Sequence, residues 1–225
     1  MATSAVQSSP PHRGGKRYFL LLIDDMSRFM WLTLIASKGE AAAAIKKFKA
    51  RAELESGRKL KALRTDRGGE FTSIEFGAYM ADHGVHRQLT APYLPQQNGV
   101  VERRNQTVVA MAHSMMKTKG VPGRFWGEAV HTAVYLLNRS PTKPLDGTTL
   151  YEAWYGEQPS VHHLRTFGCV GHVKDVRPHL KKLDDRSTLL VLLGYEPGSK
   201  AYRLYDPVGD RVHVSRDVVF DESAS

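Results

Sequence analysis

Residues 16–35 read KRYFLLLIDDMSRFMWLTLI, and this stretch decides the first half of the fold. Two apolar runs of strand length flank the polar segment DDMSR, a pattern that predicts a β-hairpin buried on at least one face. Both runs are far shorter than the roughly 20 apolar residues that a membrane-spanning helix needs. We therefore expect a soluble domain that begins with two neighbouring antiparallel strands.

The segments after the hairpin alternate between helical and strand patterns. In the first predicted helix Ile45, Phe48 and Ala52 share one face, and Gly57 ends it. The expected elements are a helix over 40–56, a strand over 60–65, a helix over 72–83, a strand over 85–89, a long helix over 98–119 and a helix over 124–138. The order ββαβαβ followed by two helices indicates an α/β domain.

A change of pattern divides the chain into regions. Residues 1–15, MATSAVQSSPPHRGG, predict a flexible polar leader without the apolar segment of a secretion signal. We expect a catalytic domain over 16–140 and a proline-containing linker over 141–163 with one short helix near 150–155. Residues 164–222 contain five short β-type segments, which predict a small β-barrel.

Composition limits the classes of partner. The 225 residues carry a formal net charge of +9, which favours a polyanionic partner such as nucleic acid or an anionic membrane surface, and charge alone does not choose between them. Cys169 is the single cysteine, so the sequence contains neither a disulfide framework nor a Cys-x-x-Cys zinc motif. We expect an intracellular protein without a membrane segment.

Two acidic positions carry the strongest chemical signal. Asp66, within RTDRGGEF at 64–71, follows a predicted strand, and Glu102, within PYLPQQNGVVERRNQ at 92–106, lies in the first turns of a helix. Phosphoryl transfer by two divalent ions needs carboxylates at such rigid positions, because Mg²⁺ and Mn²⁺ prefer oxygen ligands. The pair therefore predicts a site for Mg²⁺ or Mn²⁺.

Several motifs together resemble the integrases of copia-type retrotransposon Pol polyproteins. They are GGKRYFLLLIDDMSRF, LRTDRGGEF, PYLPQQNGVVERRN, FWGEAV, YLLNRSP and the terminal GYEPGSKAYRLYDP and VHVSRDVVFDE. The resemblance covers nearly everything from Gly14 to Glu222. It implies a ribonuclease H-like α/β fold with a mixed five-stranded sheet, followed by a retroviral-polymerase SH3-like barrel. It also implies that Asp66 and Glu102 are the second and third acids of a D,D-35-E triad.

The first acid of the triad is missing. In the resembling family it lies on the strand before the hairpin, and counting back from Gly14 reaches Thr3 in a leader without any acidic residue. We therefore expect the first strand to be missing, the sheet edge beside Tyr18–Ile23 to be open and the metal site to be incomplete. Asp24 and Asp25 belong to the hairpin turn, where Asp24 is expected to bond turn amides near Ser27.

Residues around the two acids are candidates for nucleic-acid contacts. They are Arg64, Gln96, Gln97, Asn98 and Arg103. Asn98 is equally suited to cap the N-terminus of the long helix, and the arginines are equally suited to a solvated surface.

Three functions follow as alternatives. The first is an integrase catalytic domain with weak or no activity, acting on retroelement ends and target DNA. The second is a catalytically dead remnant that binds nucleic acid, and the third is a ribonuclease H-type nuclease. The resemblance also implies a nuclear location and assembly into homo-oligomers.

Overall fold

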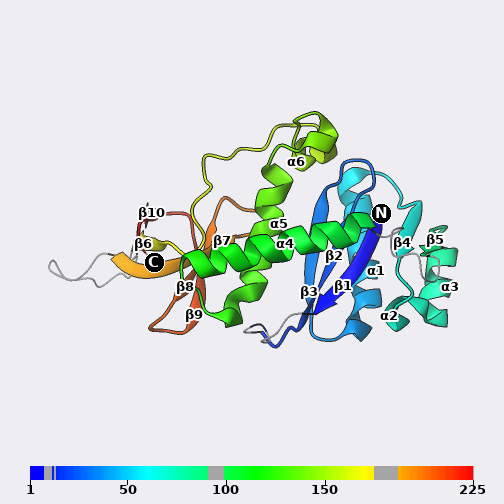
Figure 1. The fold of residues 1–225 in the computed structure, drawn as a ribbon, viewed down its shortest axis with the longest axis horizontal. Coiled ribbons are helices and arrows are strands. Elements are labelled where there is room, and N and C mark those ends of the chain that lie inside the picture. The colour runs from blue at the N-terminus through cyan, green and yellow to red at the C-terminus, as the bar shows by residue number, and fades with distance from the viewer. Residues whose placement is uncertain (8–11, 13, 91–98, 175–186, 225) are drawn as a thin grey trace. The chain divides into compact units, whose positions relative to one another are not determined.

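The computed structural model describes residues 1–7, 12, 14–90, 99–174 and 187–224. They form two compact units, drawn in Figure 1. The first unit comprises Met1–Val109 and Leu136–Pro159, and the second comprises Ala110–Tyr135 and Ser160–Ser225. Across the described ranges, no helix has the length and apolar character needed to cross a bilayer.

The first unit contains a mixed five-stranded sheet in the order β3-β2-β1-β4-β5. The strands are β1 Ala2–Gln7, β2 Tyr18–Ile23, β3 Met30–Ile35, β4 Ala62–Thr65 and β5 His86–Leu89. β1 pairs antiparallel with β2 and parallel with β4, and β4 pairs parallel with β5. This arrangement confirms the predicted ribonuclease H-like fold class and its hairpin.

The prediction that the first strand is missing was wrong. Residues Ala2–Gln7 of the expected leader form β1, in register with Ile23 to Tyr18 of β2. Thr3 also pairs with Thr65 of β4, so β1 is held on both sides and the sheet edge beside β2 is closed. The expectation rested on the absence of an acidic residue from residues 1–15, but a strand forms over Ala2–Gln7 without one.

Helices of the first unit follow the predicted periodicity closely. Ile45, Phe48 and Ala52 of α1 are buried as expected, and Gly57 ends α1 with a left-handed φ of 64°. The predicted helix over 72–83 forms as α3, Ile74–Asp82, because Ser73 is extended and caps it by accepting a hydrogen bond from the Phe76 amide. The short helix α2, Gly69–Thr72, comes before it and was not predicted.

The helices have the following bounds. They are α1 Ala41–Ser56, α2 Gly69–Thr72, α3 Ile74–Asp82, α4 Gly99–Thr118, α5 Trp126–Arg139 and α6 Leu150–Tyr155, with short 3-10 turns at Lys38–Glu40, Gly123–Phe125 and Lys143–Leu145.

Asn138, near the end of α5, secures the first residue of β3. Its Nδ2 donates to the Met30 carbonyl at 2.8 Å, and its Oδ1 accepts from the Met30 amide at 3.0 Å. The side chain is 4% exposed, so these bonds satisfy backbone groups that water does not reach. This contact explains a polar residue at the end of the segment YLLN.

The Asn138→Leu variant is expected to lose about 2 to 3 kcal/mol of unfolding free energy, because both Met30 groups stay buried without partners. Urea unfolding measures this loss. Ser140→Ala is the matched control, since Ser140 is exposed and its hydroxyl donates to the Leu136 carbonyl of α5. A loss no larger than that of the control would contradict the role of Asn138.

The second unit contains an antiparallel sheet in the order β10-β6-β7-β8-β9. The strands are β6 Val170–Lys174, β7 Ser187–Tyr195, β8 Tyr202–Asp206, β9 Arg211–Ser215 and β10 Val218–Asp221. Each of the five segments that the sequence predicted as a strand forms one. The separate all-antiparallel sheet agrees with the predicted SH3-like domain.

Within the second unit, ion pairs and side-chain packing hold the α5 region against the sheet. Arg203 of β8 forms two hydrogen bonds with Glu128 of α5, at 2.9 and 3.3 Å, and one with Glu196 at 2.9 Å. These carboxylates raise the pKa of Arg203. Phe125, in the 3-10 turn directly before α5, packs against Tyr205 with ring centroids 4.6 Å apart, and Ala129 and Ala133 of α5 are fully buried. Residues of α5 therefore belong to the core of this unit.

Thr132 of α5 meets β7 at a bulge. The register of β7 with β8 shifts between Leu192 and Gly194, and Gly194 has a φ of 143°. Thr132 Oγ1 donates to the Leu193 carbonyl at 3.1 Å. Glycine is required here, because a Cβ at position 194 would lie 2.6 Å from Thr132 Oγ1.

Candidate active site

Asp66 follows β4 directly and is half-buried. Its Oδ1 accepts a hydrogen bond from the Gly68 amide at 3.0 Å, which fixes the carboxylate in the turn that leads to α2. A Cβ at Gly68 would lie 3.0 Å from Asp66 Oδ1 and 2.8 Å from Glu70 Oε2. Two carboxylates therefore approach the same glycine. Sequence reasoning missed Glu70, although it stands beside Asp66 in RTDRGGEF.

Arg67 ties the end of β4 to the end of β5. Its Nε donates to the Thr90 carbonyl at 2.9 Å, and the Thr90 amide donates to the Thr65 carbonyl at 3.1 Å. Thr90 is the last described residue before position 99. Arg67 therefore has a structural contact at the point where the chain leaves the sheet.

Thr3 occupies the position where the sequence predicts the first acid of the triad. It lies in β1 beside Thr65, the residue before Asp66, and it is fully buried. Its Oγ1 donates to the Leu21 carbonyl at 2.7 Å. A neutral hydroxyl with its own hydrogen-bond partner thus stands beside the strand that ends at Asp66.

Glu102 lies in the first turn of α4 and is exposed. Val101 and Val108 are buried and form the core face of the helix. The partial positive charge of a helix N-terminus favours a carboxylate at this position. In the part of the chain that the structure describes, no hydrogen bond or ion pair joins Glu102 to Asp66.

The residues present do not fit a two-ion site. Among the described residues, no group of three or more His, Cys, Asp or Glu side chains is arranged to hold a metal ion. Asp66 and Glu102 remain, but two ions are ordinarily shared by three carboxylates. Thr3 has a neutral hydroxyl group, which already donates a hydrogen bond to the Leu21 carbonyl.

The predicted nucleic-acid contacts fall into three groups. Arg64 donates to Gln88 Oε1 at 3.3 Å and lies 3.8 Å from Asp25. Arg103 is exposed on α4, and within the described ranges its side chain forms no ion pair. Gln96, Gln97 and Asn98 lie outside the described residues. Arg64 is thus held by polar partners, whereas the charge of Arg103 has no ion-pair partner in the described part of the first unit.

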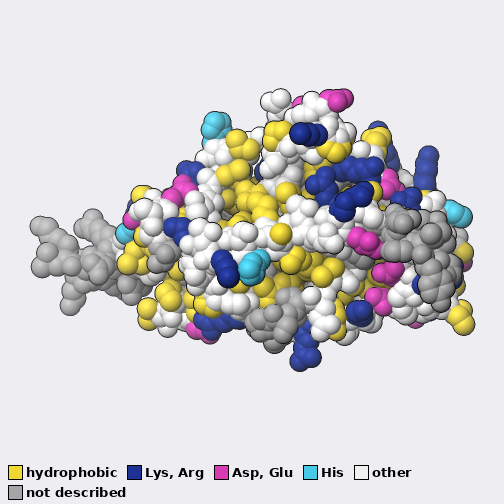
Figure 2. All heavy atoms as spheres, in the orientation of Figure 1, with side chains coloured by type: hydrophobic (Ala, Val, Ile, Leu, Met, Phe, Trp, Pro, Cys, Tyr) yellow, Lys and Arg dark blue, Asp and Glu magenta, His cyan; other side chains and the backbone are white. Residues whose placement is uncertain are grey.

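A second arginine of α4 adds to the positive charge near Arg103. Arg104 is half-buried, and burial together with the nearby charge of Arg28 lowers its pKa. Figure 2 shows Lys and Arg side chains gathered beside the N-terminal half of α4. This surface is suited to phosphate groups.

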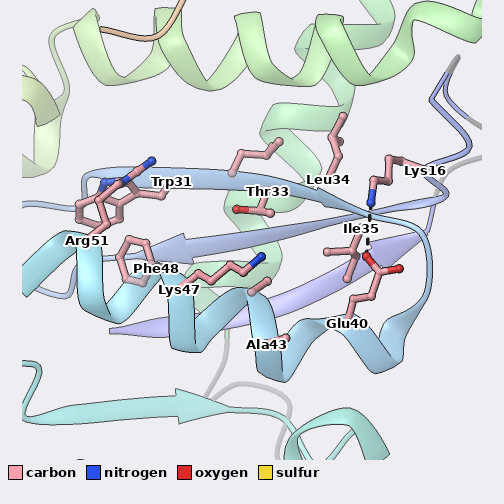
Figure 3. Close-up of a pocket in the computed structure, with 12 residues that line it drawn as sticks. Lys16, Trp31, Thr33, Leu34, Ile35, Glu40, Ala43, Lys47, Phe48 and Arg51 are labelled. Atoms are coloured by element: carbon pink, nitrogen blue, oxygen red, sulfur yellow. Dashed lines mark hydrogen bonds and ion pairs between the residues drawn. The ribbon is translucent and has the colours of Figure 1, made fainter.

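A pocket of about 410 Å³ lies between β3 and α1 (Figure 3). Trp31 and Phe48 form its apolar end, and Lys16, which lies 3.4 Å from Glu40, closes the other. β3 is the edge strand farthest from β5, with β2 and β1 between it and β4. The pocket is therefore separate from the strand that ends at Asp66.

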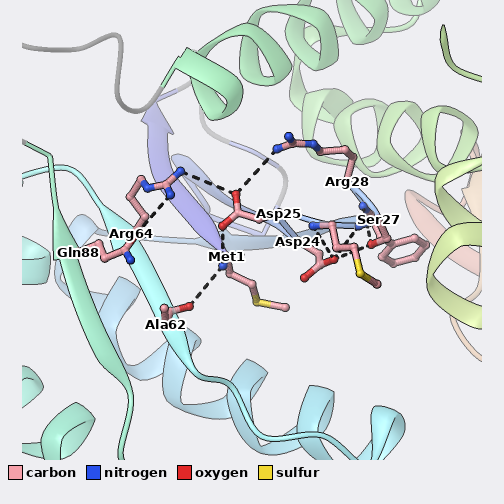
Figure 4. Close-up of polar contacts among 10 residues, drawn as sticks. Met1, Asp24, Asp25, Ser27, Arg28, Ala62, Arg64 and Gln88 are labelled. Atoms are coloured by element: carbon pink, nitrogen blue, oxygen red, sulfur yellow. Dashed lines mark hydrogen bonds and ion pairs between the residues drawn. The ribbon is translucent and has the colours of Figure 1, made fainter. Parts of the chain in front are cut away.

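Asp24 and Asp25 do not replace the missing acid (Figure 4). Asp24 Oδ2 accepts from the Ser27 amide at 2.8 Å, from Ser27 Oγ at 2.9 Å and from the Met26 amide at 3.2 Å, as predicted for a turn residue. Asp25 interacts with the Met1 amino group at 3.1 Å and with Arg28 at 3.8 Å.

The sheet register separates Asp25 from Asp66. Ile23, Ala2 and Arg64 lie side by side across three strands. Asp25 lies beyond this row toward the start of β1, and Asp66 lies beyond it in the opposite direction. At roughly 3.3 Å per residue the two acids are about 13 Å apart along the strands.

Two family models match the chain. Residues 5–95 match the integrase core domain, and residues 169–225 match the retroviral polymerase SH3-like domain. The Pol polyprotein from transposon TNT 1-94 of Nicotiana tabacum is 45% identical over 210 residues, which cover 93% of this chain. The Pol polyprotein from transposon RE2 of Arabidopsis thaliana is 32% identical over 208 residues, or 92% of the chain. The chain spans 16% and 14% of the length of these two relatives.

Proposed function

Because the chain belongs to the retrotransposon Pol polyprotein family, as an integrase core domain followed by a retroviral polymerase SH3-like domain, we propose that it binds DNA with weak or no catalytic activity. The observation that carries this proposal is the buried hydroxyl of Thr3 in place of the first acid. Loss of one ligand from a metal site removes most turnover, because the remaining ligands no longer fix the ions.

Integrase cores generally use divalent metal ions, which supply Lewis-acid chemistry at a phosphodiester. In this chain Asp66 and Glu102 are the proposed remaining ligands. Asp66 is oriented by the Gly68 amide, and Glu102 is favoured by the start of α4. Without an acid at position 3 these two residues are expected to bind Mg²⁺ or Mn²⁺ weakly.

DNA binding should depend strongly on salt, because the chain carries a net charge of +9. The Arg103→Ala variant is expected to weaken binding to any duplex sequence and to lower the slope of log K against log salt by about 1. Fluorescence anisotropy with a labelled duplex measures both. Lys47→Ala is the matched control, since Lys47 is exposed and lines the pocket between β3 and α1, which is separate from Asp66. An unchanged slope for Arg103→Ala would remove Arg103 from the DNA surface.

A nicking and strand-transfer assay with Mn²⁺ tests the catalytic part of the proposal. The native chain and its Asp66→Asn variant are expected to give the same background level, with circular dichroism as the check on folding. Activity of the native chain that disappears in Asp66→Asn would overturn the proposal, because a working metal site would then exist without an acid at Thr3.

The partners of the proposed function are retroelement DNA ends and target DNA. We propose the nucleus as its location, as the family resemblance implies, and homo-oligomers as the assembly in which the domain acts. Sedimentation with and without duplex DNA tests for the homo-oligomer. A monomer under both conditions would contradict it.

A further inference from the structure

A second hollow of the first unit, about 680 Å³ in volume, lies between the end of α1 and the start of β4. Phe48 and Ala52 of α1 contribute apolar surface and are each 7% exposed. Trp154 of α6 and Met26 of the β2–β3 turn also line it, and Met26 is 71% exposed. The hollow, here called the α1–β4 cleft, therefore offers apolar side chains to a visiting group.

Cations surround this apolar surface. Arg58, Lys59 and Lys61, on the segment between α1 and β4, line the cleft and are exposed. None of the three forms an ion pair within the described ranges. Their exposed charges favour an anionic partner at this rim.

The two carboxylates that line the cleft are already engaged. Asp24 accepts its turn hydrogen bonds from Met26 and Ser27. Glu53 accepts from Lys49 Nζ at 2.8 Å and from the Leu60 amide at 2.8 Å, and these bonds lower its pKa. Glu53 also interacts with the charge of Lys59, but the lining holds Lys49, Arg58, Lys59 and Lys61 against these two acids, so the rim of the cleft has a net positive charge.

We propose that the α1–β4 cleft docks an acidic peptide segment that places an apolar anchor side chain against Phe48, Ala52 and Trp154. Its Asp and Glu residues would pair with Arg58, Lys59 and Lys61. Recessed apolar anchors inside a charged rim are typical of peptide and protein interfaces. A volume near 680 Å³ lies within the range of about 300 to 1,000 Å³ that ligand pockets occupy.

Its position separates this cleft from the proposed DNA site. Ala62, where β4 begins, lines the cleft, whereas Asp66 follows the other end of β4. Ala62 and Asp66 are about 13 Å apart at roughly 3.3 Å per residue. A peptide in the cleft would occupy the end of the sheet that the proposed catalytic carboxylates do not use.

Fluorescence anisotropy with the fluorescein-labelled peptide EEDLFDEE tests the proposal on the full chain. The native chain is expected to bind, and the Lys59→Glu, Lys61→Glu double variant is expected to bind about tenfold more weakly. The peptide EEDSSDEE, which lacks the apolar anchor, is also expected to lose about tenfold in affinity.

The matched control is the Lys47→Glu, Arg51→Glu double variant, which makes the same charge change at the pocket between β3 and α1. It should retain the affinity of the native chain for EEDLFDEE. Absence of binding, equal binding of both peptides, or an equal loss in the control variant would each overturn the proposal. Displacement of the peptide by a DNA duplex, with the same dependence on Lys59 and Lys61, would assign the cleft to nucleic acid instead.

Discussion

The Thr3→Asp variant is expected to bind Mn²⁺ and to raise strand-transfer activity on the order of 100-fold above the native background. Position 3 lies in β1 beside Thr65, so a carboxylate there stands next to the strand that ends at Asp66. Thr3 is fully buried, and an unpaired carboxylate at that depth costs several kcal/mol. Bound metal would offset this cost.

Stability measurements separate this explanation from a folding effect. Without metal, burial raises the pKa of the new Asp above its unfolded value of about 3.9. The variant should therefore be close to native in stability below that pH and lose stability as the pH rises through the folded pKa. Mn²⁺ at neutral pH should raise its melting temperature and leave that of the native chain unchanged.

Two further variants complete this test. Thr3→Asn is similar in size to the Asp variant and uncharged, so it should show neither the pH dependence nor the response to Mn²⁺. The Thr3→Asp, Asp66→Asn double variant should lose the activity that Thr3→Asp gains. A folded Thr3→Asp protein without any response to Mn²⁺ would mean that position 3 does not face the metal site.

The Gly194→Ala variant is expected to lose about 3 kcal/mol of stability or more. Its backbone φ of 143° is one that residues with a Cβ rarely adopt, and the added Cβ would lie 2.6 Å from Thr132 Oγ1. Thr132 cannot move away without losing its hydrogen bond to the Leu193 carbonyl. Backbone strain and steric overlap with Thr132 therefore both destabilise the variant.

Gly198→Ala is the control for the strain alone. Gly198 also has a positive φ, of 74°, but a Cβ there would meet nothing within 4 Å. Its expected cost is about 1 kcal/mol, that of a left-handed backbone. Urea unfolding of both variants measures the difference, and equal losses would show that the contact with Thr132 carries no weight.

Elements with a strong periodic pattern were predictable from sequence. The hairpin was recognisable from two apolar runs that flank a polar turn, α1 from its 3.6-residue period, and the five strands of the second unit from short β-type segments between turn residues. β1 was not predictable in this way. The segment ATSAVQ has little pattern of its own and becomes a strand because β2 and β4 both pair with it.

The candidate site was predictable in its residues and less so in its contacts. Asp66 and Glu102 lie on the predicted elements, because a strand end and a helix start can be recognised locally. The hydrogen bond of Arg67 to Thr90 and the approach of Glu70 to Gly68 depend on the path of the turn after β4. A single sequence does not contain that path.

The second unit includes Ala110–Tyr135 as well as the strands that begin after residue 164. Glu128 and Thr132, which bond to Arg203 and to the Leu193 carbonyl, therefore precede the linker in the chain. A recombinant fragment starting at residue 164 would leave Arg203 with one of its two carboxylates and would uncover Tyr205, which packs on Phe125. A single boundary in the linker therefore does not give a fragment in which the sheet keeps its contacts. A fragment that contains the sheet must also include the first half of α5.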